Sequence, residues 1–283
     1  MIPLNQKAFA KINIGLEILC KRIDGYHEIN SIFSTVSLAD ELLFSDSTRF
    51  EIECFPPLGI PDEQNLIYKT AKLMQDFFRI ESLPVKITLS KNIPVGAGLG
   101  GGSSDAASVL LGLNNYFQLN ASESELLKLA SVLGSDVPYF LKNKTALVGG
   151  RGEKLEYFAF TLPYHVLLVM PDVFISTTWA YSNLNIGDKI KHPTNLRQVL
   201  AESLSNPDIL KEQIFNDFEP HVFSHYNELA EIKKILYQNG AVYASMSGSG
   251  SALYGFFNSA GQAHSVKKVL GKYRTHICVP EIY

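Results

Sequence analysis

Residues Pro94 to Ala107 read PVGAGLGGGSSDAA, and this glycine- and serine-rich stretch is the most informative part of the chain. Glycine lets bare backbone approach a ligand closely, and consecutive backbone N–H groups at the start of a helix can then point at an anion. The stretch therefore predicts a phosphate-binding loop. A glycine loop that only packs tightly, with no ligand, is the alternative.

The flanks of this loop predict a strand before it and a helix after it. Val85 to Leu89 alternates apolar and polar residues and includes β-branched side chains, which is typical of a strand. Ser103 to Phe117 carries apolar residues at helical spacing. We expect Ser103 or Ser104 to cap the helix and Asp105 to lie in its first turn, where the helix dipole favours negative charge.

Three well-known phosphate loops do not fit the pattern. Gly96, Gly98 and Gly101 satisfy G-x-G-x-x-G, but a dinucleotide-binding fold needs a second parallel strand after the helix. Ser122 to Leu133 instead opens with a capping box and predicts another helix. No lysine precedes Ser103, as the Walker pattern requires, and the glycine loop of a protein kinase would join two strands.

The loop resembles that of the GHMP small-molecule kinases, the family named for galactokinase, homoserine kinase, mevalonate kinase and phosphomevalonate kinase. The family core resembles P-x-x-x-G-L-G-S-S-A-A, and this chain is similar to a version of it with extra glycines. Lys91 looks like the family lysine near the ATP base, with a solvated surface lysine as the alternative. The resemblance implies ATP binding by Lys91, Pro94, Val95, Gly96, Ala97, Gly98, Leu99, Gly100, Gly101, Gly102, Ser103 and Ser104.

Two charged side chains are the candidates for catalysis. Apolar residues occupy every second position of residues 11–18, so Lys11 and Asn13 project together from the polar face of a strand. Ser135 is a candidate N-cap, so Asp136 should lie near a helix start. A solvated lysine and an aspartate that only begins a helix are the structural alternatives.

A tight turn near the amino end predicts a base-binding surface. The turn signal Asp24-Gly25 displays Tyr26 and His27 just past the bend. An aromatic face can stack on a base, and an imidazole can hydrogen-bond the edge of the base. A tyrosine packed on the core and a histidine that caps the turn are the alternatives.

The segment AKINIGLEILCKRIDGYHEI, Ala10 to Ile29, is similar to one branch of the same family. Members of that branch phosphorylate the 2-hydroxyl of a cytidine diphosphate derivative of methylerythritol, in the non-mevalonate route to isoprenoid precursors. Their matching lysine lies at the reaction centre, and their matching aspartate, in a G-S-D-V-P segment, is the base for the acceptor hydroxyl. The resemblance therefore implies Lys11 and Asp136 as catalytic residues.

Two further segments match the family in the carboxyl half. ASMSGSGS, Ala244 to Ser251, is similar to the M-S-G-S-G motif that closes over the phosphates and the acceptor, although by itself it reads as a hairpin with a loose loop. PDVFISTTWAY, which ends at Tyr181, is similar to the segment whose aromatic residue stacks on the cytosine. We expect Tyr181 to form a sandwich with Tyr26, and Trp179 is its nearest competitor. The implied substrate-binding residues are Asn13, Tyr26, His27, Tyr181, Gly248 and Ser249.

The composition is that of an ordinary globular enzyme. The chain has 283 residues, 46% of them hydrophobic and 19% charged, with a formal net charge of −3 and scattered lysines and arginines, which argues against a nucleic-acid surface. Cys20, Cys54 and Cys278 fit neither a disulfide framework nor a zinc site, so we expect a cytoplasmic protein. Lys7 and Glu17 interrupt the apolar residues of the amino end, which predicts neither a signal peptide nor a membrane span.

The pattern of elements predicts an α+β fold with two domains, residues 1–160 and 161–283, and a boundary near residues 158–163. The first domain mixes strands at about 8–19, 28–37, 40–46, 49–55, 85–90, 144–149 and 153–158 with helices at about 65–79, 103–117, 122–133 and 136–141. The second has a strand at 166–170, helices near 194–203 and 228–238, strands at 242–246 and 252–257, a helix at 260–271 and a strand at 275–279. This β-α-β-β-α-β order predicts a ferredoxin-like unit. The resemblance implies ligands in the cleft between the domains.

The prediction is an ATP-dependent kinase of a small cytidine-containing alcohol, with Mg²⁺ expected alongside ATP and no dedicated metal ligand that the sequence identifies. We expect neither nucleic acid nor a membrane as a partner. We expect the protein to be a monomer or a homodimer. Another kinase of the family, such as mevalonate or homoserine kinase, is one alternative, although its acceptor has no base to stack. A nucleotide-sensing protein that keeps the fold without catalysis is the other.

Overall fold

The computed structural model describes residues 2–184 and 191–278, which fall into two compact units. The first unit comprises the residues up to Ala10, Leu38–Val95 and Gly100–Asn143. The second comprises Lys11–Ser37, Gly96–Leu99 and the described residues from Lys144 onward. Two long strands, β1 (Leu4–Lys21) and β2 (His27–Asp46), contribute residues to both units. The contiguous domains predicted from the sequence, 1–160 and 161–283, therefore divide the chain differently from these units.

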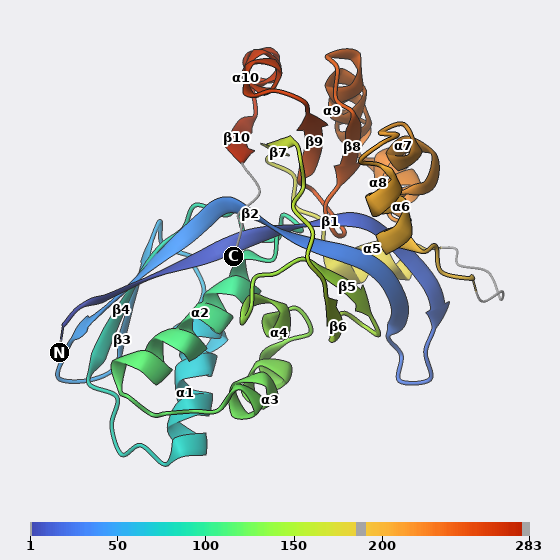
Figure 1. Cartoon of the computed structure of the whole chain (residues 1–283). Helices are drawn as coiled ribbons and strands as arrows, with labels where there is room; N and C mark the ends of the chain where they lie inside the picture. The colour runs from blue at the N-terminus through green and yellow to red at the C-terminus, as the bar shows by residue number, and fades with distance from the viewer. Residues whose placement is uncertain (1, 185–190, 279–283) are drawn as a thin grey trace. The chain divides into compact units, whose positions relative to one another are not determined.

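In the first unit, helices pack together beside a small group of strands (Figure 1). Strand β4 (Val85–Ser90) pairs antiparallel with residues 41–46 of β2 and parallel with β3 (Glu51–Phe55). The helices are η1 (Asp62–Gln64), α1 (Leu66–Phe78), α2 (Gly101–Tyr116), α3 (Glu123–Leu133) and α4 (Val137–Phe140). The predicted capping box of α3 is confirmed, since Ser122 and Glu125 bond each other's backbone N–H groups.

Helix α2 is buried along most of its length and lies close to β2. Gly112 allows this approach, because a Cβ atom at that position would come within 2.3 Å of the Phe44 ring. The helix begins earlier than the sequence predicts. Gly100, in the left-handed region at φ +73°, takes the N-cap position, so neither Ser103 nor Ser104 caps the helix. Asp105 consequently lies beyond the first turn.

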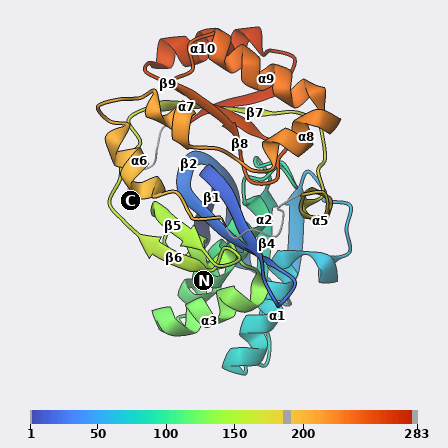
Figure 2. The same cartoon turned by 90° about the vertical axis from the view of Figure 1, so that its right-hand side faces the viewer.

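The second unit contains a four-stranded antiparallel sheet with the order β10-β7-β9-β8. Its strands are β7 (His165–Met170), β8 (Tyr243–Met246), β9 (Leu253–Phe257) and β10 (Arg274–Cys278). Helices α9 (Asn227–Gln238) and α10 (Ala260–Val269) cover one face of this sheet (Figure 2). The predicted ferredoxin-like order is thereby confirmed.

Several elements of the second unit differ from the expectation. The predicted strands at 28–37 and 40–46 are one strand, β2, because the residues between them include no glycine or proline to end it. Strands β5 (Ala146–Gly149) and β6 (Lys154–Tyr157) follow, with β5 paired to residues 31–33 of β2. Between β7 and α9 lie α5 (Thr177–Ser182), α6 (Leu196–Glu202), α7 (Ile209–Gln213) and α8 (Glu219–His225), of which the sequence predicts only α6.

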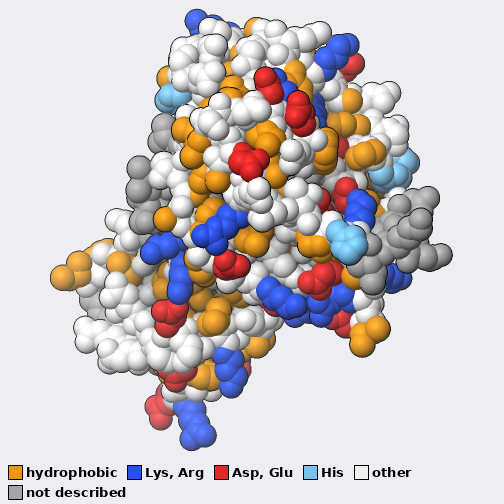
Figure 3. Space-filling view, turned by 45° about the vertical axis from the view of Figure 1, so that its right-hand side comes forward, with side chains coloured by type: hydrophobic (Ala, Val, Ile, Leu, Met, Phe, Trp, Pro, Cys, Tyr) orange, Lys and Arg blue, Asp and Glu red, His pale blue; other side chains and the backbone are white. Residues whose placement is uncertain are grey.

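The surface carries charges of both signs. On the face drawn in Figure 3, lysine and arginine side chains are interspersed with aspartate and glutamate side chains. Among the helices of the described chain, none has the length and apolar character needed to cross a membrane.

Candidate active site

The predicted site residues belong to both units, and the surroundings of each group are described within its own unit. The first unit holds Lys91, Pro94, Val95, Gly100, Gly101, Gly102, Ser103, Ser104 and Asp136. The second holds Lys11, Asn13, Tyr26, His27, Gly96, Ala97, Gly98, Leu99, Tyr181, Gly248 and Ser249.

In the first unit, the start of α2 has the properties of an anion site. The leading N–H groups of an α-helix have no partner within the helix, and its dipole places partial positive charge there. Ser104 is 1% exposed, and its hydroxyl has no hydrogen-bond partner among the residues that the structure describes. A buried polar group without a partner is costly, so a ligand that supplied one would be favoured here.

Lys91 lies in a buried ion-pair cluster of the first unit. Its Nζ is 2.5 Å from an Asp40 carboxylate oxygen and 2.9 Å from an Asp105 oxygen, and its side chain is 6% exposed. The alternative of a solvated surface lysine is therefore wrong. A Cβ at Gly101 would meet Lys91 Nζ at 3.3 Å and Ile93 at 2.8 Å, so glycine is needed where the helix start packs on this cluster.

The cluster shifts the pKa values of Asp105 and Lys91 because it holds two carboxylates and one ammonium group. Burial raises the pKa of Asp105 to about 7, with the Asp40 charge adding to the effect and Lys91 opposing it. For Lys91, burial alone would lower the pKa, but the charges of Asp105 and Asp40 outweigh it and raise the pKa. Protonation of one carboxyl would leave the buried cluster neutral. The second Asp105 oxygen, Oδ1, has no hydrogen-bond partner among the described residues.

Asp136 occupies the N-cap position of α4 and is partly exposed. The sequence predicts Ser135 as the cap, but the helix begins one residue later than that assignment requires. The Asp136 side chain makes no capping hydrogen bond. Pro138 lies within the first turn, as expected, where its missing N–H costs nothing.

Lys11 and Asn13 project from the same side of β1, as the alternation of residues predicts. Lys11 Nζ donates to Asn13 Oδ1 at 2.5 Å and lies 4.4 Å from the centroid of the Phe33 ring. Asn13 Nδ2 in turn donates to Ser31 Oγ at 3.0 Å. Lys11 is 4% exposed, so it is a fixed buried cation and not a solvated surface residue.

The glycine loop passes through the second unit at Gly96–Leu99 and there contacts the loop between β8 and β9. Ser247 Oγ donates to the Gly98 carbonyl at 2.9 Å, and Lys11 N donates to the Leu99 carbonyl at 3.0 Å. A Cβ at Gly98 would lie 2.0 Å from the Ser247 carbonyl oxygen, and its φ is +75°. Both facts require glycine at this position.

Gly248 and Ser249 lie in this β8–β9 loop. Gly248 adopts φ +59°, which favours glycine, and Ser249 Oγ lies 3.2 Å from Thr177 Oγ1 at the start of α5. Thr177 is a neighbour that the sequence does not single out. Its segment lies far along the chain from the loop, so only the folded structure brings the two hydroxyls together.

The turn between β1 and β2 presents Tyr26 and His27, as expected. Tyr26 N donates to Asp24 Oδ1 at 3.1 Å, and the Tyr26 ring is 52% exposed with the Arg151 guanidinium 4.8 Å from its centroid. His27 lies stacked on Tyr181, with centroids 4.9 Å apart and planes inclined by 15°. The structure thus places Tyr181 against His27, the residue that follows Tyr26, and the sandwich of Tyr26 and Tyr181 around a cytosine stays a prediction.

Burial lowers the pKa of His27, and the positive charge of Lys21 lowers it further. The imidazole is therefore held neutral at physiological pH, with one ring nitrogen able to donate a hydrogen bond and the other able to accept one. A neutral imidazole is suited to the edge of a pyrimidine base. Arg151 beside Tyr26 is a second residue that sequence reasoning missed, and its Gly-Arg-Gly turn was the available signal.

Comparison with known proteins gives two family matches. Residues 65–144 match the model described as GHMP kinases N terminal domain, and residues 196–274 match the model described as GHMP kinases C terminal. The 4-diphosphocytidyl-2-C-methyl-D-erythritol kinase of Pelodictyon phaeoclathratiforme is similar to this chain, with 41% identity over 283 residues, which is 99% of this chain and 98% of that protein.

Solved structures give a parallel result. A crystal structure of a 4-(cytidine 5'-diphospho)-2C-methyl-D-erythritol kinase aligns with a TM-score of 0.85 and 32% identity, covering 99% of this chain and all of that one. The Methanococcus jannaschii mevalonate kinase aligns with a TM-score of 0.75 at 14% identity, covering 99% of this chain and 98% of that one. The second likeness is one of fold alone.

Proposed function

Because the chain belongs to the GHMP kinases, in the branch of the 4-diphosphocytidyl-2-C-methyl-D-erythritol kinases, we propose that it phosphorylates the 2-hydroxyl of 4-diphosphocytidyl-2-C-methyl-D-erythritol. ATP is the phosphoryl donor, and ADP and the 2-phosphate are the products. One observation favours this acceptor over others used in the family. His27, which follows the exposed Tyr26 in the chain, stacks on Tyr181. The aromatic surface formed by these three residues suits a cytosine.

The glycine loop and the start of α2 bind the nucleotide in this proposal. Backbone N–H groups of Gly100 to Ser103 lie where the helix dipole favours phosphate oxygens, and Ser104 contributes its hydroxyl. Gly96 to Leu99 completes the loop, and Pro94 and Val95 lead into it. Lys91 supports the loop from the buried ion-pair cluster against which Gly101 packs.

Asp136 and Lys11 are the two catalytic residues of this proposal. The Asp136 carboxylate takes the proton of the 2-hydroxyl, whose oxygen then bonds to the γ-phosphorus while the bond from that phosphorus to the β–γ bridging oxygen breaks and ADP leaves. The buried Lys11 ammonium stabilises the negative charge on the transferring group, and Asn13 fixes Lys11 through their hydrogen bond. Tyr26, His27 and Tyr181 hold the cytosine, while Gly248 and Ser249 close on the phosphates.

Mg²⁺ in this reaction arrives with the nucleotide. Among the described residues no group of three or more His, Cys, Asp and Glu side chains could hold a metal ion. Mg²⁺ usually binds through substrate phosphates, water and one or two side chains. Ser104, whose buried hydroxyl has no protein partner among the described residues, is the side chain that we propose as a ligand. The cation neutralises phosphate charge.

The proposed setting of the reaction is the cytoplasm. Within the described chain, Cys20, Cys54 and Cys278 form no disulfide, as expected of thiols in a reducing compartment.

The acceptor assay separates this function from its alternatives. ADP release from Mg-ATP is measured with the cytidine acceptor, with mevalonate, with homoserine and with no acceptor, for the wild type and Asp136→Asn. We expect turnover with the cytidine acceptor alone, and its loss in the variant. Turnover with mevalonate or homoserine would overturn the assigned acceptor, and nucleotide binding without any turnover would favour a sensor.

A further inference from the structure

The turn formed by Phe215–Glu219, called the 215–219 turn below, is anchored to strand β1. Leu16 N donates to the Phe215 carbonyl at 2.8 Å, and Asp217 N donates back to the Leu16 carbonyl at 2.9 Å. Both segments lie in the second unit. Because β1 also carries Lys11, the turn has a fixed position relative to the proposed catalytic lysine.

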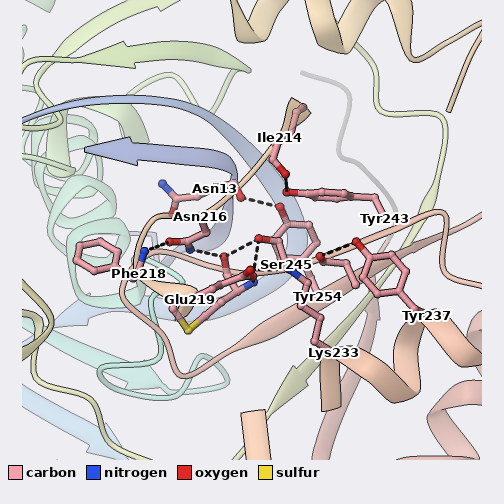
Figure 4. A network of polar contacts seen from close by, with 12 residues as sticks. Asn13, Ile214, Asn216, Phe218, Glu219, Lys233, Tyr237, Tyr243, Ser245 and Tyr254 are labelled. Atoms are coloured by element: carbon pink, nitrogen blue, oxygen red, sulfur yellow. Dashed lines mark hydrogen bonds and ion pairs between the residues drawn. The ribbon is translucent and has the colours of Figure 1, made fainter. Parts of the chain in front are cut away.

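Asn216, at the centre of this turn, holds the β8–β9 loop through its side chain. Its Nδ2 donates to the carbonyls of Met246 and Gly248, both at 2.8 Å, and its Oδ1 accepts from Phe218 N at 3.0 Å. The residue is 2% exposed. Figure 4 shows the side chain among the polar contacts that converge on the end of β8. Asn216 therefore uses both donor hydrogens of its amide on the loop and its entry.

Glu219, the last residue of the 215–219 turn, also binds the end of β8. Its Oε1 accepts from Met246 N at 2.8 Å and from Ser245 Oγ at 3.0 Å, and Lys233 Nζ donates to its Oε2 at 2.5 Å (Figure 4). The carboxylate is buried, and the ammonium group balances its charge. The end of β8 is thus held at both its N–H and its carbonyl before the loop begins.

The geometry of one peptide group explains what this arrangement does for the loop. The carbonyl of Gly248 and the N–H of Ser249 belong to the same trans peptide, so they point in opposite directions. Because Asn216 binds the carbonyl, the Ser249 N–H points away from the 215–219 turn. Within the described chain, neither the Ser249 N–H nor the Gly248 N–H donates a hydrogen bond. Two adjacent N–H groups in a glycine-containing loop are suited to binding an anionic oxygen.

We propose that Asn216 is a positioning residue for phosphoryl transfer: it orients the Gly248–Ser249 peptide so that the Ser249 N–H donates to an oxygen of the transferring phosphoryl group. This inference rests on the proposed kinase function and adds a residue to it. The residue contacts neither substrate nor nucleotide and acts only through the loop. Through β1 and the loop, the 215–219 turn holds Lys11 and this N–H in one frame.

Asparagine is the side chain that this position requires. Aspartate has nearly the same shape but no donor, so its carboxylate would face two carbonyl oxygens and repel them. Serine keeps one donor on a shorter side chain and can hold only one of the two carbonyls. Asn216→Asp and Asn216→Ser should therefore release the Gly248 carbonyl to different extents.

The test compares these two variants with a matched control. Tyr237→Phe removes a hydrogen bond of similar kind, from Tyr237 OH to the Ala244 carbonyl at 3.2 Å on the same strand β8, but does not touch the loop. For each protein we would measure kcat, the KM of the cytidine acceptor, the Kd of a non-hydrolysable ATP analogue and the thermal midpoint, with assays run well below the lowest midpoint. The Kd of the ATP analogue tests the role of Asn216 independently of the kinase assignment, because its measurement needs no turnover.

We expect Asn216→Asp to lower kcat by about tenfold to a hundredfold, because a lost oxyanion donor costs about 10² to 10³ and the loop retains part of its orientation. The kcat of Asn216→Ser should lie between those of Asn216→Asp and the wild type. The acceptor KM of the Asn216 variants should stay within about twofold of wild type, and so should the kcat of Tyr237→Phe. Equal kcat in the Asn216 variants and the wild type would overturn the proposal, as would losses that match Tyr237→Phe at equal thermal midpoints. If Asn216→Asp does not fold, Asn216→Ser decides. If the wild type phosphorylates no acceptor, the kinase assignment fails, and an unchanged Kd in Asn216→Ser would then overturn the positioning role.

Discussion

His27 and Tyr181 form a parallel aromatic stack, with ring centroids 4.9 Å apart and planes inclined by 15°. Phe218 meets the Tyr181 ring edge-on, with centroids 4.9 Å apart and an interplanar angle of 89°. The Tyr181 ring is therefore fixed by two neighbours before any base arrives. A ring fixed in advance loses little conformational freedom on binding, which favours affinity for a stacked ligand.

Replacing Tyr181 should weaken the acceptor and leave the nucleotide unaffected. Stacking of a base on an aromatic side chain contributes about 1–3 kcal/mol, so Tyr181→Ala should raise the KM of the cytidine acceptor about tenfold or more. The KM of ATP should stay within about twofold, because α5 is not part of the proposed nucleotide site. Steady-state kinetics with each substrate varied in turn would measure both values.

Trp179 provides the control for this variant, since it lies two positions away and also contacts aromatic rings. Its partners are His221, His225 and Tyr226, with centroids 5.0 to 5.7 Å away. Trp179→Leu should therefore leave the acceptor KM close to that of the wild type. A larger effect from Trp179→Leu than from Tyr181→Ala would show that the wrong ring was assigned to the base.

Arg151 should support acceptor binding through its contact with Tyr26. An exposed cation–π contact contributes about 0.5–1 kcal/mol, so Arg151→Met should raise the acceptor KM about two- to fivefold. Lys154→Met is the matched control, because Lys154 is an exposed cation that follows the same turn and makes only a distant ion pair with Glu28 at 3.9 Å. An equal rise in both variants would mean that general positive charge, and not the Tyr26 contact, sets the KM.

Lys91 should be important for stability because two carboxylates depend on it. Lys91→Met leaves Asp40 and Asp105 buried without a cation, which should lower the free energy of unfolding by about 3–5 kcal/mol. Lys86→Met, on strand β4 just before Lys91, removes an exposed pair with Glu53 and should leave the unfolding midpoint nearly unchanged. Urea unfolding of both variants would contradict this account if they lost the same stability.

Asp105 should make stability fall as pH rises from acid toward neutral. Its pKa is raised from 3.8 to about 7, so between these values the folded protein binds a proton that the unfolded chain has released. The contribution of Asp105 to the free energy of unfolding therefore decreases as pH rises from 3.8 to about 7, and it no longer changes at higher pH. Asp105→Asn cannot titrate, so the variant should gain stability relative to wild type between pH 5 and pH 8. A constant difference across these pH values would contradict the assignment.

The local elements were predictable because they depend on short patterns. The capping box of α3 and the alternation that places Lys11 beside Asn13 both appear in the sequence and in the structure. The ferredoxin-like order followed from the sequence of helices and strands. The start of α2 was not predictable from the sequence, because Gly100 in the left-handed region moved the N-cap ahead of both serines. Glycine permits such a conformation, but the sequence does not say which glycine uses it.

The long-range contacts of the site were beyond sequence reasoning for a physical reason. Asn216 and Gly248 are 32 residues apart, and nothing local to either residue indicates the other. The stacking of Tyr181 on His27 depends on how α5 packs in the second unit. Short helices such as α5, α7 and α8 owe their stability to packing more than to propensity, so their patterns are weak.

In the proposed reaction, this chain moves the γ-phosphoryl group of ATP to one hydroxyl of a cytidine-bearing acceptor. The most direct test is to follow the label from γ-³²P-ATP into product and to locate it on the acceptor by ³¹P NMR and mass spectrometry. We expect one labelled product, phosphorylated at the 2-hydroxyl, formed with stoichiometric ADP. Label released as inorganic phosphate, or found on another acceptor in its place, would contradict it.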